Sequence, residues 1–253
     1  MADGYLVGQG KIYLAPRNTT TNAIGAYRWI GDASGFEITG AEDFLDYEEN
    51  YSGSRVRVVH IPLSTTAGYS MDMRNITAAN LAAAVHGNFS TGAGATVTAQ
   101  PITGYNDSIV FLANPGVSSV VINKAGTPLV LGTDYTLDAV NGTITILPGS
   151  TAVTAVMGAV ALTANYTFAA NGGTVQAMTA RYQEFALRYV GFSQSDGSAI
   201  MVNMPRVTVD IAASLALIGN DVATLTVTGG ILPAPEITAS ATVSNLYTIT
   251  RGA

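Results

Sequence analysis

The stretch "EFALRYVGFSQSDGSAIMVNMPRVTVDI", residues 184–211, decides the fold, because it predicts two β-strands joined by a turn. Phe185, Leu187 and Tyr189 are set against Glu184 and Arg188, as in a strand with one buried face. Asp196-Gly197 favours a turn between the two halves. The second half alternates in the same way around Pro205, a residue that marks an edge strand or a bulge.

Two further stretches predict strands. In "GYSMDMRN" (68–75), a tyrosine and two methionines alternate with polar residues, which is typical of a half-buried strand. "DYTLDAVNGTITILPG" (134–149) predicts a β-hairpin, because Asn141-Gly142 suits a two-residue type I′ turn. With that turn, Leu137 is expected opposite Ile146.

One short helix is predicted in "NITAANLAAAVHG" (75–87). Thr77 is the expected N-cap, the alanines form the body, and Gly87 ends a helix of about 77–86. A second helical turn is expected at 212–219. The predicted fold class is therefore mainly β, with one short flanking helix.

Small residues mark candidate boundaries near 90–101 and 169–174. The Thr- and Val-rich region between them is either a β-rich insertion at about 101–168 or further strands of a single domain, 1–253. Its most apolar part (152–168) is interspersed with Thr, and Gly, Pro and Asn break the flanking sequence. We therefore expect packed strands there and no membrane span.

The composition points to assembly. Of the 253 residues only 11% are charged, while 48% are hydrophobic, so much of the surface is expected to be shared with other subunits. The net charge of −6 argues against sequence-independent binding of nucleic acid. No cysteine is present and the first residues show no secretory pattern, which suits assembly inside a cell.

Catalytic patterns are missing from the sequence. The two histidines, His60 and His86, have no neighbours at metal-ligand spacing. Neither a nucleophile elbow nor a phosphate-binding loop is found. The sequence therefore predicts no catalytic residues, no metal and no cofactor, and a protein that is not an enzyme.

Charge is concentrated in "EDFLDYEENYSGSRVR", residues 42–57. Its spacing fits neither a carboxylate pair in a pocket nor a calcium loop. It is either a solvated hairpin or an arm that contacts an adjacent subunit, and the interleaved aromatic residues favour the arm. The candidate inter-subunit arm comprises Glu42, Asp43, Phe44, Asp46, Tyr47, Glu48, Glu49, Tyr51, Arg55 and Arg57.

Two parts of the chain carry a family resemblance. One is the strand "AGYSMDMRN" (67–75) followed by "NLAAAVHG" (80–87). The other is the series "YVGF", "DG", "MVNMPRVTVD" and "LALIGNDVATLTVTG" within 189–229. Over nearly its whole length, in the order of its predicted elements and in its residue patterns, the chain resembles the major tail tube protein of long-tailed, siphovirus-like bacteriophages.

This resemblance implies a tail-tube β-sandwich or barrel with one flanking helix, whose strands join those of neighbouring copies in a continuous inner β-barrel. It implies homo-oligomeric rings, most often hexameric, stacked into a hollow tube that delivers genomic DNA to the host without binding it specifically. The implied partners are further copies, tape measure, tail terminator and baseplate proteins. The implied location is the tail of a virion whose proteins are made in the bacterial host cytoplasm.

Two other readings remain open. A β-sandwich surface adhesin or capsid-decoration module shares the strand-rich composition. A β-rich hydrolase would need a coherent acid–base or metal set, which the sequence does not show.

Overall fold

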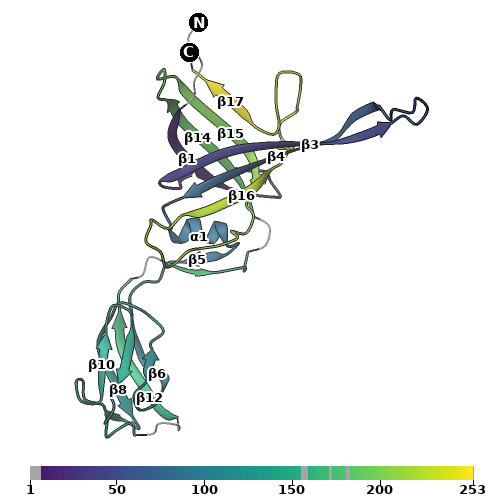
Figure 1. Ribbon diagram of the computed structural model, residues 1–253. Coiled ribbons are helices and arrows are strands. Elements are labelled where there is room, and N and C mark those ends of the chain that lie inside the picture. Colours follow the sequence, from purple (N-terminus) through teal and green to yellow (C-terminus); the bar gives the residue numbers. More distant parts are fainter. Residues whose placement is uncertain (1–6, 155–158, 171–172, 181–182, 253) are drawn as a thin grey trace. The chain divides into compact units, whose positions relative to one another are not determined.

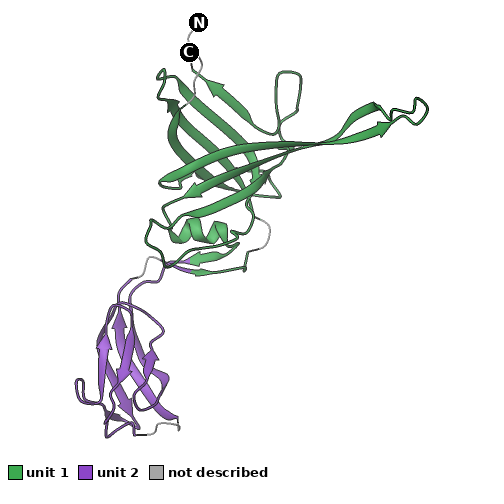
Figure 2. Cartoon of the chain, in the orientation of Figure 1, with its two compact units in different colours: residues 1–89, 175–253 green, residues 90–174 purple. Residues whose placement is uncertain are grey.

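The structure, a computed structural model, describes residues 7–154, 159–170, 173–180 and 183–252. It is mainly β, as the sequence predicts, with one short helix in these ranges. The chain forms two compact units, shown in Figure 2.

Unit 1 comprises residues 1–89 and 175–253, and unit 2 comprises residues 90–174. Unit 2 includes the whole range 101–168, where the sequence suggested an insertion, and it extends beyond this range in the sequence on both sides. Both of its boundaries fall within or beside the small-residue stretches that mark candidate boundaries.

Unit 1 is built on one antiparallel sheet of eight strands, in the order β2-β1-β14-β15-β16-β4-β3, with β17 paired to β15 (Figure 1). Within the described residues no sheet closes into a barrel, so the single chain does not contain the barrel that the resemblance implies. The strands are β1 (Gly8–Arg17), β2 (Arg28–Trp29), β3 (Ala33–Glu48), β4 (Arg57–Met73), β14 (Glu184–Ser193), β15 (Ala199–Thr208), β16 (Leu225–Ile231) and β17 (Thr248–Arg251).

The core of unit 1 follows the predicted alternation. Tyr69, Met71 and Met73 on β4 are at most 2% exposed, and Leu187 on β14 is fully buried. Pro205 predicted an edge strand or a bulge. At Pro205, β15 places two residues opposite one residue of β14, so the bulge is the alternative that the structure confirms.

The predicted helix is confirmed as α1 (Ala78–Ala84), with the Thr77 hydroxyl accepting a hydrogen bond from the Asn80 N–H. It ends with His86 in the left-handed region (φ 49°), while the Gly87 N–H donates to the carbonyl of Ala82. The left-handed residue is thus His86, one position before the predicted stop. The short strands β5 (Asn88–Ser90) and β13 (Thr174–Gln176) pair with each other beyond the helix.

The predicted helical turn at 212–219 is wrong, because this segment has no regular structure. The Ala212 N–H donates instead to the Ala84 carbonyl at the end of α1, and Leu215 packs on the core. Tertiary contacts at the start of the segment therefore override its helical propensity.

Unit 2 has two antiparallel sheets, β6-β12-β8-β9 and β10-β11-β7, over a shared apolar core. Ile122, Ile144 and Ile146 in this core are fully buried. Residues 155–158, part of the stretch 152–168, lie outside the described residues. The strands are β6 (Ala95–Gly104), β7 (Ile109–Phe111), β8 (Val117–Lys124), β9 (Thr127–Pro128), β10 (Tyr135–Asp138), β11 (Thr143–Ile146) and β12 (Val160–Phe168).

The hairpin of β10 and β11 is present, but its predicted register is wrong by two residues. Leu137 pairs with Ile144 and not with Ile146, so the loop has four residues. The Asp138 carboxylate accepts hydrogen bonds from the N–H groups of Val140 and Asn141, which stabilises this longer loop. The buried face is unchanged, because a shift of two residues preserves the alternation.

Candidate functional site

The acidic segment lies in a long hairpin formed by β3 and β4. The strand β16 pairs with β4 only over residues 67–73. Residues 41–66 therefore form a ribbon of two strands, to which no other described strand pairs. Figure 1 shows this ribbon projecting from the sheet of unit 1. We call residues 41–66 the arm. A two-stranded ribbon is marginally stable alone, so a projecting one is suited to gaining contacts from another molecule.

One face of the arm is apolar. Leu45 pairs with Ile61, and Tyr47 pairs with Val59 on the same side of the ribbon. Leu45, Tyr47 and Ile61 are 50%, 56% and 51% exposed. These paired side chains form a contiguous apolar strip that has no cover within the described part of the chain.

The opposite face of the arm carries ion pairs and one aromatic ring. Asp46 lies 2.5 Å from His60 Nδ1 and 3.1 Å from Arg57 Nη1, and the Phe44 ring stacks on His60 with centroids 4.1 Å apart. The hydrogen bond with His60 and the neighbouring Arg57 lower the pKa of Asp46. The ribbon is therefore amphipathic, with its ion pairs on one side and its apolar strip on the other.

The tip of the arm is organised by Glu49. Its carboxylate accepts hydrogen bonds from the N–H groups of Tyr51 and Ser52 and from the Ser52 hydroxyl. Hydrogen bonds from Ser52 are the main reason why the pKa of Glu49 is lowered. Gly53 (φ 79°) and Arg55 (φ 48°) complete the turn, and Tyr51 is 88% exposed.

All ten predicted arm residues lie on this one hairpin. Glu42, Asp43 and Glu48 stand opposite Thr65, Ser64 and Arg57, respectively. Arg57 has an acidic partner, Asp46, inside its own hairpin, which the sequence did not indicate. The pairing of Arg55 and Arg57 with acids of an adjacent subunit stays a prediction.

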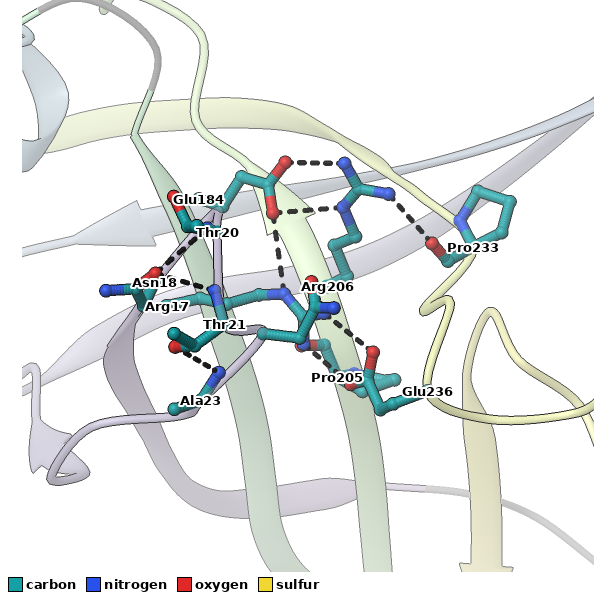
Figure 3. A network of polar contacts seen from close by, with 11 residues as sticks. Arg17, Asn18, Thr20, Thr21, Ala23, Glu184, Pro205, Arg206, Pro233 and Glu236 are labelled. Carbon is teal, nitrogen blue, oxygen red and sulfur yellow. Dashed lines mark hydrogen bonds and ion pairs between the residues drawn. The ribbon is translucent and has the colours of Figure 1, made fainter.

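A second polar group, which sequence reasoning missed, joins β1, β14 and β15 (Figure 3). Arg17 Nη1 and Nη2 lie 2.7 Å from the two carboxylate oxygens of Glu236. Arg206 binds both oxygens of Glu184 at 2.6 and 3.0 Å, and Arg17 Nε lies 3.4 Å from Glu184 Oε2. The Arg17 and Glu184 side chains are 0% and 2% exposed.

This network is suited to holding the sheet and the segment after β16 together. Arg206 also donates to the carbonyl of Pro233, at 3.0 Å. The hydrogen bond with Glu236 is the main reason why the pKa of Arg17 is raised, and it likewise lowers the pKa of Glu236. The charged residues are up to 219 positions apart, so no local pattern in the sequence could have identified the network.

Other chemistry-bearing groups are sparse in the described residues. In those residues no cluster of three or more His, Asp or Glu side chains could hold a metal ion. His86 Nε2 lies 2.6 Å from the Val209 carbonyl. Within the same ranges, no helix is long and apolar enough to cross a membrane.

The fold and the arm define a mainly β protein of two units, with a projecting amphipathic hairpin and an open-edged sheet. A family model described as "Protein of unknown function UCP028589" matches residues 5–250, so the chain belongs to this family. No curated protein matches the chain.

Proposed function

We propose that this protein is a structural virion protein, the subunit of a phage tail tube whose stacked rings form a hollow conduit for DNA delivery into the host. The observation that carries the proposal is the amphipathic arm. An apolar strip on a ribbon that leaves the sheet is suited to pairing with another subunit, because covering it removes apolar surface from water.

Two further features support assembly. The outer edge of β3 has no partner strand along its pairing with β4 in the described chain, and long open edges favour strand addition from another molecule. The net charge of −6 suits a lumen through which DNA slides, because phosphate is repelled. In this proposal the copies form rings, hexameric by resemblance, and strands of adjacent copies complete the barrel that the single chain lacks.

The other expectations from the resemblance belong to the same proposal. The partners are tape measure, tail terminator and baseplate proteins, and the site of action is the virion tail, with synthesis in the host cytoplasm. The protein acts by assembly and not by catalysis.

Electron microscopy of the purified protein over a range of concentrations tests the proposal. Rings or hollow tubes are the expected result. A protein that stays monomeric at every concentration contradicts it, and so does an assembly without a central channel.

A second candidate function, a surface adhesin or capsid-decoration module, is favoured by unit 2. This unit has its own core and is inserted between β5 and β13, which pair with each other. Because those strands are adjacent, a short turn can replace residues 91–173. If the shortened protein still forms tubes, assembly resides in unit 1 and unit 2 is an accessory. If assembly is lost and unit 2 alone binds cells or capsids, the second function is the better one.

A further inference from the structure

The sheet of unit 1 has a back face, opposite its core, that carries cations and aromatic rings. On β1 the buried Ile12 and Leu14 point into the core, so the residues between and beside them point to the back. The register of β1 with β14 and β2 adds the residues directly opposite these. We call this set of side chains, with the neighbouring Tyr27, the cationic face: Lys11, Tyr13, Tyr27, Trp29, Arg188 and Val190.

The side chains of the cationic face lie close together and leave apolar surface in water. Lys11 Nζ lies 5.2 Å from the centre of the Trp29 ring. Burial raises the pKa of Tyr27 and the charge of Arg188 opposes that rise, so the phenol and the guanidinium are near each other. Trp29, Val190 and Tyr27 are 52%, 44% and 39% exposed. Aromatic residues and Arg are enriched at protein interfaces, so this surface has the composition of one.

The two cations of this face lack an acidic partner. Among the described residues, no carboxylate forms an ion pair with Lys11 or Arg188. Arg188 Nη2 lies 2.7 Å from the sulfur of Met201, and in the described chain its buried Nε has no hydrogen-bond partner. A carboxylate bound to the rest of the guanidinium would offset part of the cost of that unpaired donor. The cationic face is therefore suited to a partner that is acidic and partly apolar.

The arm has the complementary chemistry. Its five carboxylates and two arginines give it a net charge of −3. Asp43 lies on the same side of β3 as Leu45 and Tyr47, because the extra residues at the register shifts belong to β4. Asp43 forms no ion pair in the described part of the chain. The exposed apolar strip therefore has an unpaired carboxylate at its base.

The arm and the cationic face of one copy are separated by the sheet. The strands β2 and β1 form one edge of the sheet and β3 forms the other. Figure 1 shows the arm leading away from β1, so the arm of one copy does not cover the cationic face of the same copy. We infer that the apolar strip of the arm docks on the cationic face of a second copy of this chain, with Asp43 beside Lys11.

Such a contact joins two different surfaces, so it is heterologous and continues from copy to copy. The inference rests on the proposed function, because it names the surface that receives the arm when copies assemble. Its failure can nevertheless be separated from the failure of the tail-tube proposal.

Disulfide trapping tests the docking, and the sequence contains no native cysteine to interfere. Leu45→Cys is mixed with Val190→Cys under mild oxidation, with the two proteins distinguishable by mass. The expected product is a mixed dimer in about tenfold excess over either homodimer, because docking raises the effective concentration of the two thiols. Leu45→Cys mixed with Val140→Cys, an exposed position in unit 2, is the control. A mixed product no more abundant than in this control overturns the inference, and so does a Leu45→Cys homodimer as the main product, which would show that arms pair with each other.

Charge exchange is the second measurement. Lys11→Glu should raise the apparent dissociation constant for self-association by at least about tenfold, because a repulsion replaces an attraction. Asp43→Lys should do the same, and Lys11→Glu/Asp43→Lys should bring the constant back to within about threefold of the wild type. Lys124→Glu changes the net charge as much as Lys11→Glu but lies in unit 2, so it should leave the constant unchanged. Lys11 and Asp43 are exposed, so the thermal midpoint of the monomer should not change in any of these variants. No recovery in the combined variant would overturn the pairing of Asp43 with Lys11.

The outcomes separate the two proposals. If the wild type forms tubes but neither the mixed disulfide nor the recovery is observed, the docking is wrong and the tail-tube proposal stands. If both are observed without rings or tubes, the docking is right and the tail-tube proposal is wrong. If the wild type neither associates nor cross-links, both are wrong.

Discussion

The apolar strip of the arm yields the sharpest prediction. We expect Leu45→Ser/Ile61→Ser to weaken assembly without unfolding the monomer. The two side chains pair across the ribbon and are 50% and 51% exposed, so about half of each remains to be buried. Full burial of such a side chain is worth about 1.5–3 kcal/mol, so covering the exposed halves of both contributes about 1.5–3 kcal/mol per arm. That corresponds to roughly a 10- to 150-fold change in the association constant.

Sedimentation velocity over a series of concentrations measures the change, and circular dichroism with thermal unfolding verifies the fold. Leu45→Val/Ile61→Val keeps the strip apolar and strand-forming, so it should assemble nearly as the wild type does. Val140→Ser removes a more exposed apolar side chain (76%) from unit 2 and should have no effect. Unchanged assembly of the serine double variant, with the fold intact, would refute the role of the strip.

Three further predictions concern charge, packing and pH. Arg55→Glu/Arg57→Glu should impair polymerisation with the fold intact, and normal tubes in electron micrographs would contradict this. Gly229→Ala should lower the free energy of unfolding by about 1–3 kcal/mol in denaturant titrations, because the added Cβ would lie 1.9 Å from the Thr208 carbonyl oxygen. In the control variant Gly219→Ala the added Cβ meets nothing within 4 Å, so the free energy of unfolding should not change. Hydrogen bonds from Ser198 hold the pKa of Asp196 at about 2. The stabilisation from this carboxylate should therefore persist above its unfolded pKa of about 3.9 and be lost as the pH falls through about 2. The difference between the thermal midpoints at pH 4 and pH 2 should then be smaller in Asp196→Asn than in the wild type. Equal differences would show that the Asp196 carboxylate does not stabilise the fold.

The strands and the helix were predictable because their signals are local. Alternation alone identified the buried faces of β4 and β15, whereas on β14 both faces are buried near Glu184 and Ala186. Pro205 indicated an edge strand or a bulge, and the bulge is present. Thr77 and the alanines that follow identified α1. In each case the residues that decide the structure are within a few positions of one another, so the sequence pattern and the tertiary fold agree.

The errors have a common physical cause, which is competition from contacts that the pattern does not encode. In the β10–β11 hairpin, hydrogen bonds to Asp138 stabilise a four-residue loop and outweigh the preference of Asn-Gly for a two-residue turn. At 212–219, the hydrogen bond to Ala84 fixes the start of a segment whose composition favours a helix.

The candidate arm was predictable as a location but not in its internal organisation. Charge density and interleaved aromatic residues identified 42–57. The partition into two faces depends on which residue pairs across the ribbon, and the register shifts near Asp43 and Glu48 break the simple alternation. The pairing of Asp46 with His60 and Arg57 follows from that register and not from spacing in the sequence.

A tube of stacked rings requires two kinds of contact, one between neighbours within a ring and one between rings, and each must be heterologous to continue. A single self-association surface gives only dimers, one ring or one filament. The arm of unit 1, with its exposed apolar strip, is a candidate for one of these contacts. In the proposed tube, the low charge content reflects surfaces that lose water on assembly. Leu45→Ser/Ile61→Ser should therefore remove one kind of contact and leave the other. Isolated rings in electron micrographs would place the arm between rings, short unclosed strings would place it within a ring, and normal tubes would contradict its role.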